Sequence, residues 1–171
     1  MSLFIPQEQA MFAAKLQRCL TGDCPTIADV RAIWGENTAT FWIENQIRDL
    51  NEYYGSKNKM NTLQIQDLAR ILVGEFYYLK LAEFMVFFAY IKSGRYGTFY
   101  GGVDPMTITT AMQKFKSDRA AWLQRIEENE QMKRIQEKPV RDPEKLTWAE
   151  WKEIGWMWNM GFFFDKNGKI M

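Results

Sequence analysis

The sequence predicts an all-α protein: a compact multi-helix domain with a glycine- and aromatic-rich loop, a long charged helix and a small C-terminal β-hairpin. Apolar residues recur at helical spacing in several separate stretches of the chain. Residue pairs typical of helix starts precede most of these stretches. The 171 residues are 47% hydrophobic and 15% aromatic, which supplies enough apolar surface for one core.

The N-terminal part of the chain predicts two helices. Residues 7–20 carry apolar residues at approximately helical spacing, and Gly22 follows as a stop signal. Thr26 and Asp29 form a capping-box pattern, which starts a short second helix that Gly35 ends. One face of this short helix holds Ile27, Val30, Ile33 and Trp34.

Two longer helices are expected next. Asn37 can cap a third helix, which Gly55 ends. Asn61 and Gln64 repeat the capping-box pattern before a fourth helix over about residues 62–78. The apolar residues of the third helix are Phe41, Trp42, Leu50 and either Tyr53 or Tyr54.

The centre of the core is expected at residues 81–91, which are apolar almost all round, as in a helix buried on most sides. Gly74 makes one unbroken helix through this part of the chain less favourable, because glycine is a poor helix former. We therefore expect a break near Leu79 and Lys80 and two consecutive helices. The predicted core residues are Leu68, Ile71, Leu72, Phe76, Phe84, Phe87 and Phe88.

Residues 93–103 contain four glycines and no helical period, which predicts a structured loop or a small hairpin. Asp104 followed by Pro105 is a strong helix start, and a long charged helix is expected to reach about residue 138. Two prolines then mark a linker. The expected organisation is one helical domain over residues 1–138, with a linker and a Trp-rich segment packing on it over residues 139–171.

The C-terminal segment is expected to form a helix and a hairpin. Thr147 and Glu150 give a capping-box pattern, and Asn167-Gly168 between β-prone arms predicts a tight turn. The helix contains Trp148, Trp151, Trp156 and Trp158. Two interpretations stay open: the tryptophans dock on the core as a stripe, or they form a partner interface, since Trp is frequent at binding hot spots.

The residue inventory excludes several kinds of chemistry. The 22 Lys and Arg against 21 Asp and Glu leave a net charge of +1, which gives no overall electrostatic argument for binding nucleic acid. The chain has no histidine and two cysteines, Cys19 and Cys24, so it lacks the ligands for a closed zinc site. We expect no cofactor. The few cysteines, the absence of a signal-peptide pattern and the short apolar runs predict a cytoplasmic protein without a membrane partner.

Acid–base catalysis without histidine would depend on lysine or carboxyl groups. Glu75 and Glu83 lie in aromatic-rich sequence, where burial can raise the pKa of a carboxyl group. Their spacing puts them about 80° apart around a helix, so the two groups need not converge. We expect each to be partly exposed or hydrogen bonded at a helix edge, and the protein not to be an enzyme.

A group of cationic and aromatic residues in and beside the loop favours nucleic acid or partner binding. Its members are Lys92, Arg95, Tyr96, Phe99 and Tyr100. Positive charge beside flat rings is the combination that single-strand binding uses. The alternative is that the rings pack beneath the loop and anchor it.

One further set of residues lies within about residues 62–120: Ala82-Glu83-Phe84, Phe87-Phe88, the run from Lys92 to Gly101, Val103-Asp104, Phe115 and Arg119. This set resembles an uncharacterised family of small helical proteins associated with phages and mobile elements of gut anaerobes. The resemblance implies an accessory role, such as helicase loading in DNA replication, and it supplies no catalytic residues to carry over. We therefore expect a non-enzymatic adapter with protein and single-stranded nucleic acid contacts. The alternative is a protein interaction module, such as a host-defence inhibitor or a virion component.

Overall fold

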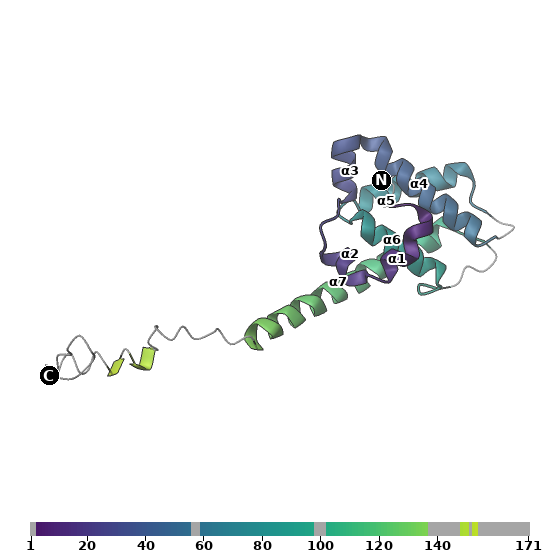
Figure 1. The fold of residues 1–171 in the computed structure, drawn as a ribbon. Coiled ribbons are helices and arrows are strands. Elements are labelled where there is room, and N and C mark those ends of the chain that lie inside the picture. The colour runs from purple at the N-terminus through teal and green to yellow at the C-terminus, as the bar shows by residue number, and fades with distance from the viewer. Residues whose placement is uncertain (1–2, 56–58, 98–101, 137–147, 151, 154–171) are drawn as a thin grey trace, which may run out of the picture. The chain divides into compact units, whose positions relative to one another are not determined.

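The protein is mainly helical, which confirms the expected fold class (Figure 1). The computed structural model describes residues 3–55, 59–97, 102–136, 148–150 and 152–153. The chain divides into two compact units, Met1–Glu128 and Asn129–Met171. Among the described helices, none is both long enough and apolar enough to cross a membrane.

The helices of the described residues follow one another along the chain with short connections. They are the 3-10 helix η1 (Pro6–Glu8) and the α-helices α1 (Gln9–Ala13), α2 (Leu16–Thr21), α3 (Ile27–Trp34), α4 (Glu36–Tyr53), α5 (Thr62–Glu75), α6 (Leu81–Lys92) and α7 (Pro105–Gln136). Residues 148–150 and 152–153 are also helical. The expected C-terminal hairpin lies outside the described residues.

Three of the predicted helix starts, at Thr26, Asn61 and Asp104, are confirmed by local side-chain bonds. In α3, the Asp29 amide donates to Thr26 Oγ1 at 3.1 Å and the Thr26 amide donates to Asp29 Oδ2 at 2.8 Å. In α5, Asn61 and Gln64 make the same reciprocal pair, both at 2.9 Å. The Asp104 carboxylate accepts from the Thr107 amide at 3.0 Å, just before α7. These bonds satisfy amides that have no partner inside the helix.

The prediction of one helix over residues 7–20 is wrong, because the stretch is divided into η1, α1 and α2. Lys15 interrupts it with φ −119° and ψ 40°, outside the helical region. Both α1 and α2 pack against α6. The interruption therefore allows two short segments to cover the central helix where one straight helix would diverge from it.

Two other boundaries differ from the prediction. The N-cap of α4 is Gly35, not Asn37, and its φ of 92° is a conformation that favours glycine. The α5 helix ends at Glu75, not near Tyr78, because Phe76 leaves the helical conformation with φ −114° and ψ 29°. The expected break before residue 81 is confirmed.

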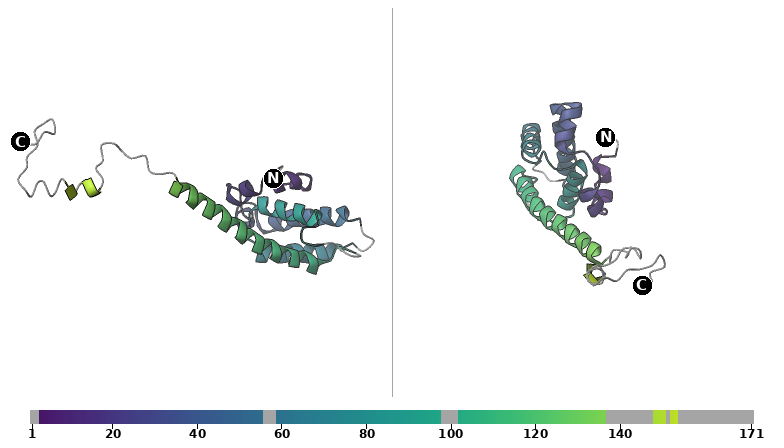
Figure 2. Two further views of the ribbon diagram at one scale, coloured as in Figure 1. Left: turned by 90° about the horizontal axis from the view of Figure 1, so that it is seen from below. Right: turned by 90° about the vertical axis from the view of Figure 1, so that its left-hand side faces the viewer.

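The core centres on α6, whose side chains are buried over most of its circumference. The α1, α2 and α4 helices pack against it, and α3 and α5 pack against α4. Figure 2 shows α4 and α5 side by side. The prediction of Ile71 as a core residue is wrong, because its side chain is 50% exposed on α5. The confirmed members are Leu68, Leu72, Phe76, Phe84, Phe87 and Phe88.

The segments that precede α3 and α6 run antiparallel where Thr26 faces Lys80, and they exchange backbone hydrogen bonds. The amides of Ile27 and Ala28 donate to carbonyls of the second segment at 3.0 and 2.9 Å, and the Leu81 amide donates to the Pro25 carbonyl at 2.9 Å. Lys80 Nζ donates to the carbonyls of Leu20 and Gly22, each at 2.8 Å. The first backbone amides of α3 and α6 therefore find their hydrogen-bond acceptors in the segment that precedes the other helix.

Candidate functional site

The predicted binding residues of the loop make contacts with α4, α6 and α7. Lys92, at the end of α6, forms an ion pair with Asp49 of α4, and its Nζ lies 5.3 Å from the centre of the Tyr53 ring. Its side chain is 17% exposed. Phe99 and Tyr100 lie outside the described residues.

Arg95 stacks on two rings. Its guanidinium carbon lies 4.5 Å from the centre of the Tyr90 ring and 5.0 Å from that of the Trp122 ring. Its Nη2 is also 3.9 Å from an Asp118 carboxylate oxygen. The Arg95 side chain nevertheless remains 43% exposed, and its 3.9 Å separation from Asp118 is longer than a hydrogen bond.

Tyr96 turns its ring toward the core. The ring centre lies 6.4 Å from the centres of Phe87, Tyr90 and Phe115. Its hydroxyl donates to Asp118 Oδ2 at 3.1 Å. Burial, followed by the negative charge of Asp118 and this hydrogen bond, raises the pKa of the Tyr96 phenol far above its ordinary value.

We name this arrangement the loop cluster. It consists of Phe87, Tyr90, Arg95, Tyr96, Phe115, Asp118 and Trp122. The cluster joins the start of the loop to α6 and α7 through rings and one shared carboxylate. The contacts that the structure describes for this cluster are the ones expected if the rings pack beneath the loop and anchor it.

The two glutamates weighed for acid–base chemistry lie in different environments. Glu83 is fully buried, and Arg119 Nε donates to its Oε1 at 2.7 Å. Its Oε2 accepts from the Lys80 backbone amide at 2.8 Å, which caps α6. Glu75 is exposed and accepts a hydrogen bond from Gln113. Both oxygens of Glu83 therefore serve the fold.

The predicted tryptophan interface is described at one position. The Trp148 side chain is 77% exposed. Trp151, Trp156 and Trp158 lie outside the described residues. Within the part of the chain that the structure describes, no three His, Cys, Asp or Glu side chains are grouped so that they could hold a metal ion.

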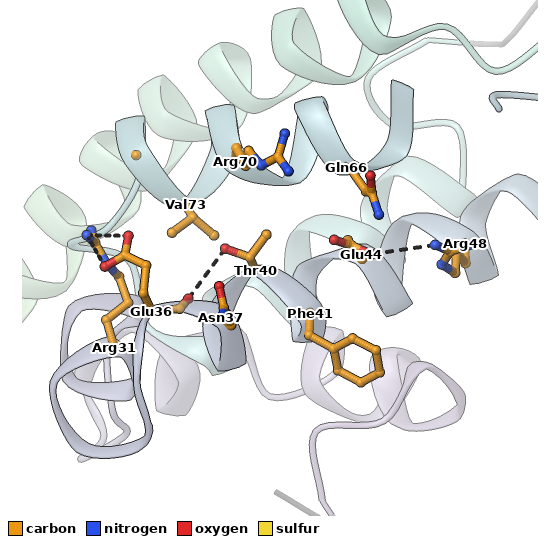
Figure 3. Close-up of a pocket in the computed structure, with 11 residues that line it drawn as sticks. Arg31, Glu36, Asn37, Thr40, Phe41, Glu44, Arg48, Gln66, Arg70 and Val73 are labelled. Carbon is orange, nitrogen blue, oxygen red and sulfur yellow. Dashed lines mark hydrogen bonds and ion pairs between the residues drawn. The ribbon is translucent and has the colours of Figure 1, made fainter. Parts of the chain in front are cut away.

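A second region, which the sequence interpretation did not single out, is a polar groove of about 630 Å³ between α4 and α5 (Figure 3). We name it the α4–α5 groove. It is lined by Arg31, Glu36, Asn37, Thr40, Phe41, Glu44, Arg48, Gln66, Arg70, Val73 and Gly74. Figure 3 shows Arg31 at one end, Arg48 at the other and Arg70 on the α5 side between them.

Each arginine of the groove is paired with a carboxylate and remains accessible. The nitrogen–oxygen distances are 2.7 Å for Arg31 with Glu36, 3.5 Å for Arg48 with Glu44, and 3.0 Å for Arg70 with Asp67. The three arginine side chains are 33%, 45% and 67% exposed, respectively. Pairs this exposed contribute little to stability.

Large apolar side chains lie on the helices beside this groove. Ile33 and Trp34, at the end of α3, are 66% and 53% exposed, and Phe41 on α4 is 72% exposed. We name these three residues the apolar set. The exposure of Phe41 could have been predicted from helical spacing, because Phe41 falls outside the stripe of buried α4 residues. These buried residues are Ala39, Trp42, Ile43, Gln46, Ile47 and Leu50.

Comparison with known proteins gives a family and no further relative. No curated protein and no solved structure matches the chain. The model of a family of unknown function, DUF6633, matches residues 59–156. The matched region contains α5, α6, the loop and α7, and includes the stretch for which an uncharacterised family was expected. Because the match covers more than half of its length, the chain belongs to the DUF6633 family.

Proposed function

We propose that the protein is a non-enzymatic adapter that binds a protein partner through the α4–α5 groove and the apolar set. The observation that carries the proposal is the exposure of Phe41, which lines a groove with three arginines, and of Trp34, at the end of the helix that contributes Arg31 to it. Tryptophan and arginine are the residues most enriched among those that dominate binding energy at protein interfaces. Exposed apolar residues next to a polar groove are typical of a partner surface.

The setting of this adapter follows from the resemblance described above. We place it in a phage or mobile element, where it serves DNA replication by acting on a protein of the replication machinery, as a helicase loader does. A host-defence inhibitor or a virion component is the alternative setting. All three roles require a protein partner, which is why the proposal rests on the surface and not on the setting.

Single-stranded nucleic acid is less well supported as the principal ligand. Of the two cations predicted to contact it, Lys92 is paired with Asp49 and is only 17% exposed. Arg95 is 43% exposed but lies over two rings and 3.9 Å from Asp118. Phosphate binding gains its energy from cations that replace condensed counterions, and an internal carboxylate competes for that role. The non-enzymatic part of the proposal is supported by the absence of histidine and by the two engaged oxygens of Glu83.

The test is affinity purification of the tagged full-length chain from its own host. We expect a protein partner that is captured by the wild type and lost with Trp34→Ser combined with Phe41→Ser. Leu63→Ser is the matched control, because Leu63 is 70% exposed on α5 but does not line the groove. Capture that persists in the double variant, or is lost equally in the control, contradicts the proposed surface.

A second measurement separates the nucleic acid alternative. A labelled oligothymidine is titrated with the wild type and with Arg95→Ala combined with Tyr96→Ala, at low and at high salt. If the wild type binds, the affinity falls with salt and the folded double variant fails to bind, then the loop is a nucleic acid site and the proposal is overturned. We expect no salt-dependent binding.

A further inference from the structure

We propose that a depression at the junction of α1 and α2 binds a phosphate monoester or free phosphate, held by Lys15 and Arg18. We name it the α1–α2 depression. It has a volume of about 690 Å³ and is lined by Ala14, Lys15, Leu16, Gln17, Arg18 and Thr21. The proposal goes beyond the adapter function, because it concerns a different surface and a small anion.

The cations of this depression differ from the arginines of the α4–α5 groove in their partners. Lys15 and Arg18 are exposed, and none of the ion pairs found between described residues includes either side chain. The residues that line the depression include no carboxylate. Each arginine of the groove, by contrast, is paired with one. The depression therefore presents positive charge that its own lining does not neutralise, and an anion is complementary to it.

The interruption between α1 and α2 brings the two cations to one place. The α1 helix ends at Ala13, and Lys15 leaves the helical conformation with φ −119° and ψ 40° just before α2 begins. Arg18 follows three residues later, a spacing at which side chains of a helical turn are neighbours. The exposed side-chain amide of Gln17 lines the same depression and adds further donors.

The backbone that carries these side chains is anchored to the core. Cys19 and Leu20, the next residues of α2, are 5% and 3% exposed. Lys80 Nζ donates to the carbonyls of Leu20 and Gly22, and the Gly22 amide donates to the Arg18 carbonyl at 2.9 Å. Only the side chains must therefore become ordered when a ligand binds, which limits the entropy cost of binding.

The number of charges favours phosphate over the other common anions. A phosphate monoester carries about −1.5 to −2 charges at pH 7, which matches the two positive charges of Lys15 and Arg18. A carboxylate carries a single charge. A nucleic acid strand gains its affinity from a series of cations along its backbone, and the lining of this depression supplies two. Arginine also presents planar donors that match phosphate oxygens.

The experiment titrates inorganic phosphate into the ¹⁵N-labelled full-length protein and records its amide spectrum. Chloride keeps the ionic strength constant, so that general screening does not change during the titration. We expect saturable shifts of the amides of residues 15–21. Lys15→Gln combined with Arg18→Gln should weaken this binding about tenfold or more, because the charged hydrogen bonds are lost while the side chains stay long.

The matched control removes two cations elsewhere. Lys114 and Lys116 are exposed on α7 and do not line the depression, so Lys114→Gln combined with Lys116→Gln should leave the affinity unchanged. All four substituted side chains are exposed, so both double variants should give spectra of folded protein.

A second arm identifies the source of the phosphate. Adenosine 5′-monophosphate that shifts the same amides at concentrations about tenfold lower than inorganic phosphate assigns the site to a nucleotide. Equal affinities assign it to free phosphate. Adenosine lacks the phosphate and should not shift these amides.

Three results overturn the proposal: shifts that do not saturate, equal affinities of the wild type and the Lys15 and Arg18 double variant, or equal weakening in both double variants. The last result would show a general effect of net charge. None of these variants alters Trp34 or Phe41, so failure here leaves capture of the protein partner to be decided by its own test.

Discussion

The loop cluster and the α4–α5 groove contain similar residues but differ in how those residues are used. In the loop cluster, Arg95 is stacked on two rings and Tyr96 is bonded to Asp118. The arginines of the two regions are similarly exposed, 43% for Arg95 and 33% to 67% in the groove, so the difference lies in the rings. In the groove, Phe41 is exposed and nothing packs on the Cβ position of Gly74. The comparison teaches that arginine and aromatic content does not identify a binding surface, whereas the contacts already made by those side chains do.

The largest expected difference between the two regions concerns their phenylalanines. Phe87 is fully buried against Phe88, Tyr96 and Phe115, so Phe87→Ala should lower the free energy of unfolding by about 3 to 5 kcal/mol. The control Phe41→Ala should change it by less than about 0.5 kcal/mol, because the ring is exposed. Urea denaturation of both variants measures this. Equal losses would contradict the contrast between a closed and an open region.

The next effect is the loss of the buried ion pair next to the loop cluster. Arg119→Ala leaves the fully buried Glu83 without its charged partner. Because the Arg119 side chain is 22% exposed, we expect a loss of about 2 to 3 kcal/mol, less than for a fully buried pair. Arg70→Ala in the groove is the control and should cost about 0 to 1 kcal/mol. A loss for Arg70→Ala as large as that for Arg119→Ala would show that the groove arginines are structural.

Two glycines give a smaller comparison with opposite signs. Gly94 begins the loop with a φ of 76°, so Gly94→Ala should lower the free energy of unfolding by about 1 to 2 kcal/mol. Gly74→Ala in the groove should raise it by up to about 1 kcal/mol, because alanine is the better helix former and its Cβ has room. Thermal unfolding of the two variants under one set of conditions decides the signs. Destabilisation by Gly74→Ala would show that the Cβ position of Gly74 is not open.

The smallest effect is a pH dependence of the loop cluster. The pKa of Tyr96 is raised in the folded protein above its unfolded value near 10. Tyr96 therefore contributes stability that is complete below about pH 10 and is lost as the pH rises above it, since the unfolded state ionises first. Unfolding free energies measured between pH 8 and 11 should fall more steeply for the wild type than for Tyr96→Phe. The exposed Tyr77→Phe is the control and should follow the wild type.

At neutral pH, the same Tyr96→Phe variant should lose about 1 kcal/mol, which is the typical net value of one hydrogen bond. The bond in question is the one from the Tyr96 hydroxyl to Asp118. A variant as stable as the wild type with the same slope at high pH would show that Asp118 does not hold the loop.

Features fixed by residues close in sequence were predictable. The reciprocal bonds of Thr26 with Asp29 and of Asn61 with Gln64 need only a helical turn, so the pattern located both helix starts. The apolar circumference of α6 also follows from composition alone. The incorrect predictions concern apolar residues that were assigned to a buried face without regard to their angular position on the helix. Ile71 and Phe41 are apolar but lie outside the buried stripes of α5 and α4.

The candidate sites depend on residues that the fold brings together from distant positions. Lys92 is paired with Asp49 and Tyr96 with Asp118, and neither partner is adjacent in the sequence. The groove combines residues of α3, α4 and α5, and its walls exist only once these helices pack. The composition of the loop alone could not show that Lys92 pairs with Asp49 or that Arg95 lies near Asp118. No local pattern marks Arg31, Arg48 and Arg70 as neighbours of one groove.

The antiparallel pairing of the segments before α3 and α6 has a consequence for hydrogen exchange. The first amides of a helix have no carbonyl partner within it and commonly exchange with solvent rapidly. Here the amides of Ile27, Ala28 and Leu81 donate to carbonyls of the opposite segment. Their protons can exchange only when the two segments separate, so the three amides should share one slow rate. The ends of two helices that are far apart in the sequence thus open as a single unit, and neither can fray alone.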